Sequence, residues 1–267
     1  MSASSVSSRL RTGLVARTTR LGIALFGTAC LSIAVLNIGA SGKTEGDDGQ
    51  IAKSLATMLR AGRTVVSKSQ DRINDPKLGN KGIDAKLVLH DASQIYQDVM
   101  GVDPAAIAPD SRHGKLLHMQ MDSIAEVMDA HQETINREGV GFKGLIPAVF
   151  ARLVNEAFGR RAAGLAEIKV TAPPQLIRNV KVKPDDWELT VIQTKLISST
   201  WPKDQVYSAT APLRGTLAER TLMPEYYGRT CLTCHGSPKG EIDITGYPKE
   251  GANEGDLGAI ISIALYR

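Results

Sequence analysis

The chain has 267 residues, of which 42% are hydrophobic and 22% charged, so it can form one large domain or two small ones with an ordinary core. Only 4% of the residues are aromatic, and the 25 Gly and 12 Pro indicate many turns, which disfavours a plain helical bundle. Four arginines near the start carry the net charge of +4, since removing them from the 32 basic residues leaves 28 against 28 acidic ones. This balance excludes the one-sided basic face of a nucleic-acid-binding protein.

The first 42 residues predict a signal peptide or a transmembrane anchor. Leu21–Ala40 is a run of about twenty residues without a charge. The charged residues before it are Arg9, Arg11, Arg17 and Arg20. The run exceeds a signal core of about 7–15 residues, and the arginines favour a cytoplasmic N-terminus, so we expect an anchor in the bacterial inner membrane with the domain on the periplasmic side. Cleavage near Gly39 and Ala40 would instead give a soluble periplasmic protein.

Two segments, 50–74 and 115–136, carry apolar residues at helical spacing and also resemble each other. A shift of 62 residues, without a gap, pairs at least eight identical residues. The pairs include Leu55 and Leu117, Val65 and Val127, Gln70 and Gln132, Ile73 and Ile135, Asn74 and Asn136, Gly79 and Gly141, Lys81 and Lys143, and Gly82 and Gly144. We interpret them as a duplicated unit that forms a paired helical hairpin or a membrane-proximal bundle. Chance similarity between two amphipathic helices is the alternative.

The rest of the chain mixes helices and strands. A further helix is predicted from Pro147 to Gly159, and Pro184 followed by Asp185 predicts another helix start. Short strands are predicted at 168–171, 206–209 and 259–265. This order predicts an α+β fold. We expect a signal or anchor segment at 1–42, a helical extension with the first repeat copy at 43–114, and a sheet-containing domain at 115–267.

Cys231-Leu232-Thr233-Cys234-His235 is a C-x-x-C-H motif, the pattern of c-type haem attachment. Two thiols three residues apart on one helical turn can add to the two vinyl groups at one porphyrin edge, and the adjacent imidazole can then bind the iron. The motif predicts one covalent haem c per chain, with Cys231 and Cys234 as attachment residues and His235 as the proximal iron ligand. Export agrees with this prediction, because c-type haem is attached outside the cytoplasm.

Other interpretations of these residues stay open. Half of a zinc site would need a second ligand pair, and a disulfide or thioredoxin-like redox pair would not need His235. Arg178 and Arg229 are candidates for pairing with haem propionates, although solvated arginines are the simpler interpretation. The carboxylates at 185–186 and 250–256 have the Pro, Gly and Asn neighbours of turns and caps. Because no acid–base set accompanies them, we expect no enzymatic activity.

The residues around the motif resemble those of a known family, over most of Gln50–Arg267. The similar stretches are Leu222–Tyr227, Cys231–Gly236, Pro238–Glu241, Gly246–Pro248 and Gly255–Ala259, with Gly141–Gly144, Pro147–Phe150 and Arg178–Asn179 upstream. They resemble a PAS-like c-type haem domain, long catalogued as a domain of unknown function, which occurs alone or as the extracytoplasmic input module of bacterial sensor kinases. The resemblance implies a PAS-like antiparallel sheet enclosing a haem that is used for redox or gas sensing.

The distal iron ligand is left open by this resemblance. Some members of the family use a Cys there, but the only Cys outside the motif is Cys30, in the N-terminal apolar run. The Met and His candidates are Met223, His118, Met119, Met121, Met128 and His131. A vacant or water-bound position is the alternative, and helical spacing favours core packing for Met121 and Met128.

Two functions follow from a single haem in an exported domain. The first is a haem-based redox or gas sensor, a signal-input module that acts on a protein partner or through self-association. The second is a mono-haem cytochrome that transfers electrons between periplasmic partners. A purely structural haem in an interaction module is a third alternative.

Overall fold

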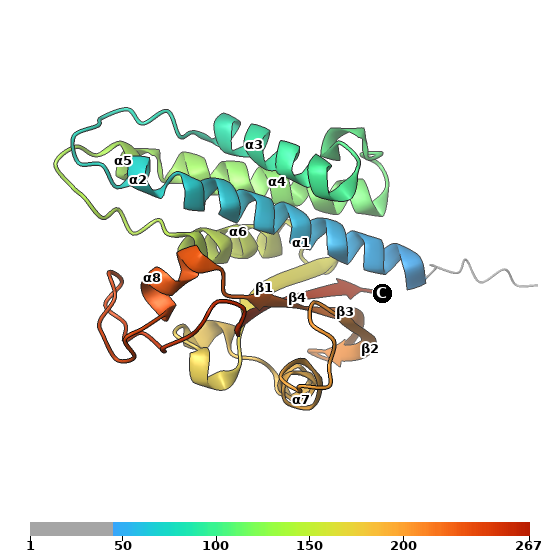
Figure 1. Ribbon diagram of the computed structural model, residues 1–267. Helices are drawn as coiled ribbons and strands as arrows, with labels where there is room; N and C mark the ends of the chain where they lie inside the picture. Colours follow the sequence, from blue (N-terminus) through green and yellow to red (C-terminus); the bar gives the residue numbers. More distant parts are fainter. Residues whose placement is uncertain (1–44) are drawn as a thin grey trace, which may run out of the picture. The chain divides into compact units, whose positions relative to one another are not determined.

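The computed structural model describes residues 45–267, which belong to one compact unit, Lys43–Arg267. In this unit a layer of helices lies on one face of a four-stranded antiparallel sheet, as Figure 1 shows, so the predicted α+β class is confirmed. The predicted signal or anchor segment, residues 1–42, lies outside the described residues, and Cys30 with it. Within the described part, no helix combines the length and the apolar character needed to cross a bilayer.

Three long and two short helices form most of the helical layer and follow the predicted periodicity. They are α1 (Glu45–Lys68), α2 (Gln70–Ile73), α4 (Arg112–Ala130), α5 (Gln132–Asn136) and α6 (Pro147–Arg161). The layer also contains α3 (Ala85–Met100), which was not predicted, and the short η1 (Pro104–Ala106). The side chain of Asp84 caps α3 by accepting from the backbone N–H of Leu87, and Gly101 ends the helix with φ 73°. The long helices pack on one another, and α6 and α1 contact the sheet.

The two similar segments make matching contacts with each other. The side-chain oxygen of Asn74 accepts from the backbone N–H of Lys143, and Asn136 accepts in the same way from Lys81, both at 2.9 Å. The shift of 62 residues also places α1, α2 and α3 on α4, α5 and α6. Each copy therefore closes the loop of the other with a hydrogen bond. The predicted domain boundary between residues 114 and 115 stays a prediction.

The sheet has the strand order β1-β4-β3-β2, and every neighbouring pair is antiparallel. Its strands are β1 (Ala166–Thr171), β2 (Tyr207–Leu213), β3 (Thr216–Tyr226) and β4 (Leu257–Tyr266). In the central pair, Met223 and Ile261 share the core with the helical layer, whereas Leu222 and Ile260 belong to a second cluster on the other face. The alternation of side chains along a strand thus buries both faces of the centre of the sheet.

The second cluster is covered by α7 (Asp186–Val191) and the π-helical turn η4 (Ile192–Leu196). The helix start predicted at Asp185 is confirmed, because its side chain accepts from the backbone N–H of Glu188 while Glu188 accepts from that of Asp185, in a capping box. Between β1 and α7 the chain forms two short turns, η2 (Pro174–Leu176) and η3 (Val180–Val182). The irregular segment that holds these turns brings Arg178 to the chain between β3 and β4, where it contacts Cys234 and Asp243.

Candidate functional site

The C-x-x-C-H motif lies in the segment between β3 and β4, the two central strands of the sheet. The β3–β4 pairing is irregular at Glu225 and Tyr226. Beyond it, the backbone N–H of Tyr227 donates to Asp256 at 2.9 Å, and that of Gly255 donates to Tyr227 at 2.8 Å. These hydrogen bonds join the two ends of segment 227–256 beside the sheet, so both ends of the loop that carries the motif are fixed.

The motif forms one helical turn, made of η5 (Arg229–Cys231) and α8 (Leu232–His235). Cys231 and Cys234 are free thiols and half-buried, and residues three apart on a helix lie on the same side. Burial, followed by the charge of Asp243, raises the pKa of the Cys234 thiol. Gly236 ends the turn, where a Cβ would lie 2.6 Å from the carbonyl oxygen of Leu232. The structure thus brings the three predicted site residues together on one short turn.

The imidazole of His235 is held by two neighbours. Its Nδ1 lies 2.8 Å from Oε2 of Glu250 and 3.4 Å from the hydroxyl of Tyr227. The Tyr227 ring stacks on the imidazole, with 4.9 Å between centroids and 25° between planes. An ionised carboxylate can only accept, so the contact places a proton on Nδ1, and in the neutral form of the imidazole this leaves the lone pair on Nε2. No hydrogen bond to Nε2 is found among the described residues, and this atom is free to bind a metal.

Tyr227 itself is fixed by the start of β4. A Cβ at Gly258 would lie 2.4 Å from Cε1 of the Tyr227 ring, so only glycine leaves room for the ring. Burial raises the pKa of Tyr227 to about 12, and the nearby Glu250 carboxylate adds to this effect. The phenol is therefore neutral, and its ring covers one face of the imidazole.

Arg178 connects the carboxylates of this region to the motif. It donates to Oε1 of Glu250 at 2.8 Å, to Oδ2 of Asp243 at 2.6 Å and to the backbone carbonyl of Cys234 at 2.9 Å. Burial disfavours the charge of Arg178, but the hydrogen bonds to Glu250 and Asp243 outweigh it and raise its pKa. Burial also opposes the charges of the two carboxylates, and hydrogen bonds, from Arg178 among others, lower the pKa of both. Each of the three guanidinium nitrogens of Arg178 thus donates to a group of the protein.

The second propionate candidate, Arg229, is a surface residue. Its side chain is 88% exposed and lies 3.3 Å from Glu254, which agrees with the simpler interpretation of a solvated arginine. The predicted turn and cap role of the carboxylates is right for Asp256, which accepts from the backbone N–H of Asn253. It is incomplete for Glu250, because this residue contacts the motif histidine.

Five of the six distal-ligand candidates lie on or at the end of α4, away from the strands that flank the motif. Met128 is fully buried in the core, and Met119 and Met121 pack against it. His118 is half-buried, and Nδ1 of His131 lies 2.7 Å from the carbonyl of Val127. The helix α4 packs mainly against helices α1, α3 and α6.

The sixth candidate, Met223, lies on β3, the strand that leads to the motif. It is 3% exposed and lines a cavity of about 360 Å³ together with Arg60, Glu225 and Tyr226. A second cavity, of about 450 Å³, lies beside α7, and neither of the two is lined by Cys231, Cys234 or His235. The distal ligand stays a prediction.

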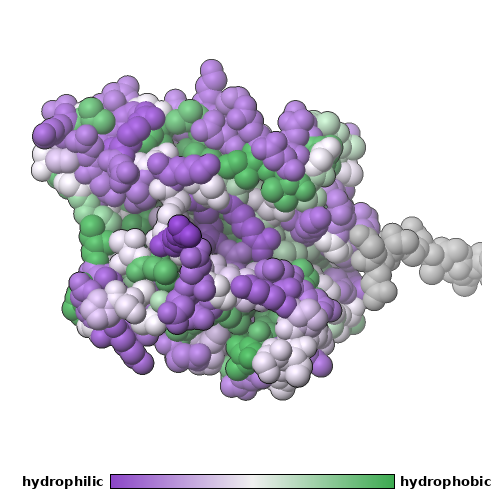
Figure 2. Space-filling model, viewed as in Figure 1, coloured by the Kyte–Doolittle hydropathy of each residue, from purple (hydrophilic) through white to green (hydrophobic). Residues whose placement is uncertain are grey.

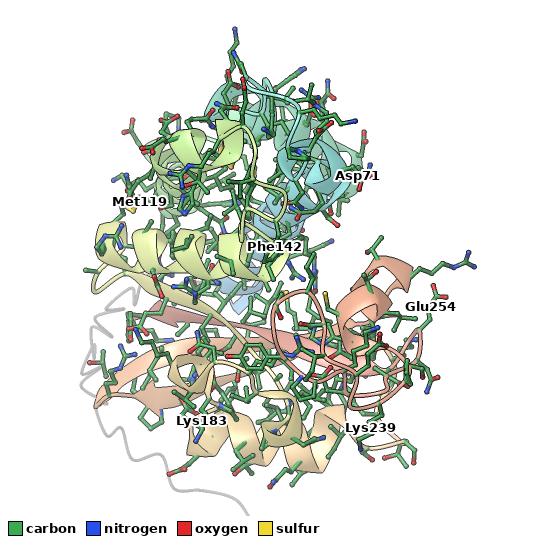
Figure 3. All side chains as sticks on the ribbon, turned by 90° about the vertical axis from the view of Figure 1, so that its left-hand side faces the viewer. Asp71, Met119, Phe142, Lys183, Lys239 and Glu254 are labelled. Atoms are coloured by element: carbon green, nitrogen blue, oxygen red, sulfur yellow. The ribbon has the colours of Figure 1, made fainter. Side chains whose placement is uncertain are left out.

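The surface around the motif is uneven. Figure 2 shows it hollowed between the helical layer and the part of the chain that carries α8. In Figure 3, Phe142, in the loop before α6, lies at the edge of the helical layer nearest the part of the chain with α8. Its side chain is 38% exposed.

A family model described as Tll0287-like, Tll0287, matches residues 49–265. This range nearly coincides with Gln50–Arg267, the range predicted from the sequence to resemble a single known family. No curated protein and no solved structure matches the chain.

Proposed function

The chain belongs to the Tll0287-like family, and from this premise and the geometry of the motif we propose that it carries one covalent haem c and acts as a haem-based redox or gas sensor. Cys231 and Cys234 would hold the haem by thioether bonds, and His235 would be the proximal ligand. The haem would supply an iron that changes oxidation state or binds a small gas. The antiparallel sheet would serve as the PAS-like frame of this site.

One observation carries the proposal: the imidazole of His235 is oriented as the histidine of a metal site is. Metal-ligating histidines almost always donate their second ring N–H to a carboxylate, a carbonyl or water. His235 does so to Glu250 at 2.8 Å, which leaves Nε2 available, and two free thiols lie on the same turn. Thiols, imidazole and spacing together suit haem c, so the residues present fit the group.

A connection from the site to α1 supports a signalling role. The carboxylate of Glu225, two residues before Tyr227, accepts from Arg60 at 2.6 Å and from Arg63 at 2.7 Å. Both arginines belong to α1, the helix that follows the N-terminal segment. A displacement of Tyr227 at the haem would therefore act on α1 through the end of β3. The output would be a protein partner or a second copy of this chain, with the domain anchored at, or soluble beyond, the outer side of the inner membrane.

The alternative function is electron transfer by a mono-haem cytochrome, and exposed apolar side chains beside the motif favour it. In the loop after α8, Ile242 is 62% exposed, Ile244 63% and Tyr247 46%. Small apolar patches suit the brief, low-area contacts of redox partners. Here the chain's residues would tether the haem and present its edge without a labile iron position.

Absorption spectra of the full chain separate gas sensing from electron transfer. The chain is expressed with haem-attachment machinery, and spectra are recorded oxidised, reduced, and reduced with carbon monoxide. For a gas sensor we expect carbon monoxide to change the reduced spectrum at micromolar concentration. An electron carrier would give a six-coordinate spectrum in both states that carbon monoxide leaves unchanged, and it would exchange electrons rapidly with a small cytochrome.

A further inference from the structure

The contact between Glu250 and His235 would do more than hold the ring in place, because it would also affect a haem iron bound at Nε2. The 2.8 Å contact joins a ring N–H to a carboxylate, and such charge-assisted hydrogen bonds are roughly twice as strong as neutral ones. A carboxylate that pulls on the Nδ1 proton leaves more electron density on Nε2. The imidazole then becomes a stronger donor to whatever metal Nε2 binds.

The position of Glu250 is fixed relative to the motif by Arg178. One guanidinium donates to both Glu250 oxygens, at 2.8 and 3.0 Å, and to the carbonyl of Cys234, the residue before His235. Asp243, whose side chain is fully buried, holds the same guanidinium from the other side. The side chain of Glu250 is only 17% exposed, so solvent screening of its contact with His235 is partial.

The charges of this group do not cancel. Glu250 and Asp243 contribute two negative charges and Arg178 one positive charge, which leaves an excess of one negative charge beside the imidazole. A nearby negative charge stabilises the more positive oxidation state of an iron centre. Ligand strength and local charge therefore act in the same direction.

We propose that Glu250 is a positioning residue that makes His235 a partly anionic proximal ligand and so lowers the reduction potential of the haem. This inference rests on the proposed haem. The step concerned is the gain of one electron by ferric iron from an external one-electron donor, and no bond of the chain forms or breaks in it. Tyr227 keeps the imidazole in the plane in which its Nδ1 proton points at Glu250.

The test compares Glu250→Gln with Glu254→Gln in the full, haem-loaded chain. Gln at 250 keeps the size of the side chain and removes its charge, whereas Glu254 is a 56% exposed carboxylate in the same loop, paired with Arg229. For Glu250→Gln we expect the equilibrium constant for reduction to rise about tenfold, which is about 59 mV in midpoint potential. For Glu254→Gln we expect a much smaller rise.

Resonance Raman spectra of the reduced proteins give a second readout. The iron–histidine stretching frequency should fall in Glu250→Gln and stay unchanged in Glu254→Gln, because only the first variant weakens the ligand itself. If Glu250→Gln does not retain haem, Glu250→Asp replaces it, since the shorter carboxylate withdraws from Nδ1, and we expect a smaller rise in potential. Loaded variants with the wild-type potential and frequency would overturn the inference alone. A wild-type chain without covalent haem would overturn the proposed function as well.

Discussion

Replacing Gly258 with alanine tests whether the start of β4 holds the Tyr227 ring against His235. The new Cβ would lie 2.4 Å from Cε1 and 2.6 Å from Cζ of that ring. Non-bonded carbon atoms prefer separations of about 3.5–4.0 Å. The ring must therefore move by about 1 Å, and the imidazole that stacks on it at 4.9 Å must follow.

The energetic cost follows from the same geometry. The backbone of Gly258 lies outside the left-handed region, so its conformation permits alanine, and the less flexible unfolded chain of the variant would contribute a gain of about 0.4–1 kcal/mol. Overpacking of a tight contact costs about 1–3 kcal/mol. We expect a net loss of about 1–2 kcal/mol in the free energy of unfolding.

Urea unfolding of the full chain, followed by tryptophan fluorescence, measures this loss. Gly228→Ala is the matched control, because a Cβ there meets nothing within 4 Å and the φ of Gly228 is −93°. We expect the control to match the wild type or to exceed it slightly. Equal stability of the two variants, with equal haem spectra, would refute the tight contact between Gly258 and Tyr227.

Two further predictions concern the rest of the fold. Asn74→Ala and Asn136→Ala should each lower the free energy of unfolding, measured with urea, by about 1–3 kcal/mol, because each leaves one backbone N–H of the other copy without its acceptor. Losses that differ strongly between the two variants would argue against equivalent copies. Although burial opposes its charge, the N–H of Glu188 and the guanidinium of Arg220 lower the pKa of Asp185 below 3.8. The contribution of Asp185 to stability is thus present above that value and is lost as the pH falls through the folded-state pKa. Asp185→Asn should therefore make the free energy of unfolding fall less steeply at acid pH. An unchanged dependence on pH would contradict this linkage.

The helical layer could be predicted where apolar residues keep a helical spacing, as in α1, α4 and α6. The helix α3 was missed although its buried residues Val88, Ala92 and Tyr96 recur every four positions between a capping Asp84 and Gly101. The local pattern therefore held enough information for this element. The repeat predicted which residues correspond, but only the fold shows that Asn74 and Asn136 exchange hydrogen bonds between copies.

The strand β3 could not be predicted from its first half by alternation, because the residues buried there include polar ones. Glu219, Arg220 and Thr221 are all buried in the sheet. Arg220 is accommodated by an ion pair with Asp185 at 2.6 Å and by the Trp187 ring at 4.3 Å, and both partners come from a distant part of the chain. Such burial depends on tertiary contacts and leaves no periodic trace in the sequence.

The candidate site, too, could be predicted from the sequence only in part. Cys231, Cys234 and His235 occupy five consecutive positions, so spacing alone predicts that they act together. Glu250 reaches His235 only because an irregular loop folds back over fifteen positions, and Arg178 arrives from a segment before α7. No sequence period relates these residues to the motif, and their roles became visible only in the structure.

The intact mass of the exported full chain tests the central claim most directly. We expect the wild type to be heavier than its polypeptide by one haem, in a form that survives acid and organic solvent, and Cys231→Ala/Cys234→Ala to lose this added mass. A colourless wild type with the mass of the bare polypeptide, after coexpression with working haem-attachment machinery, would contradict the account.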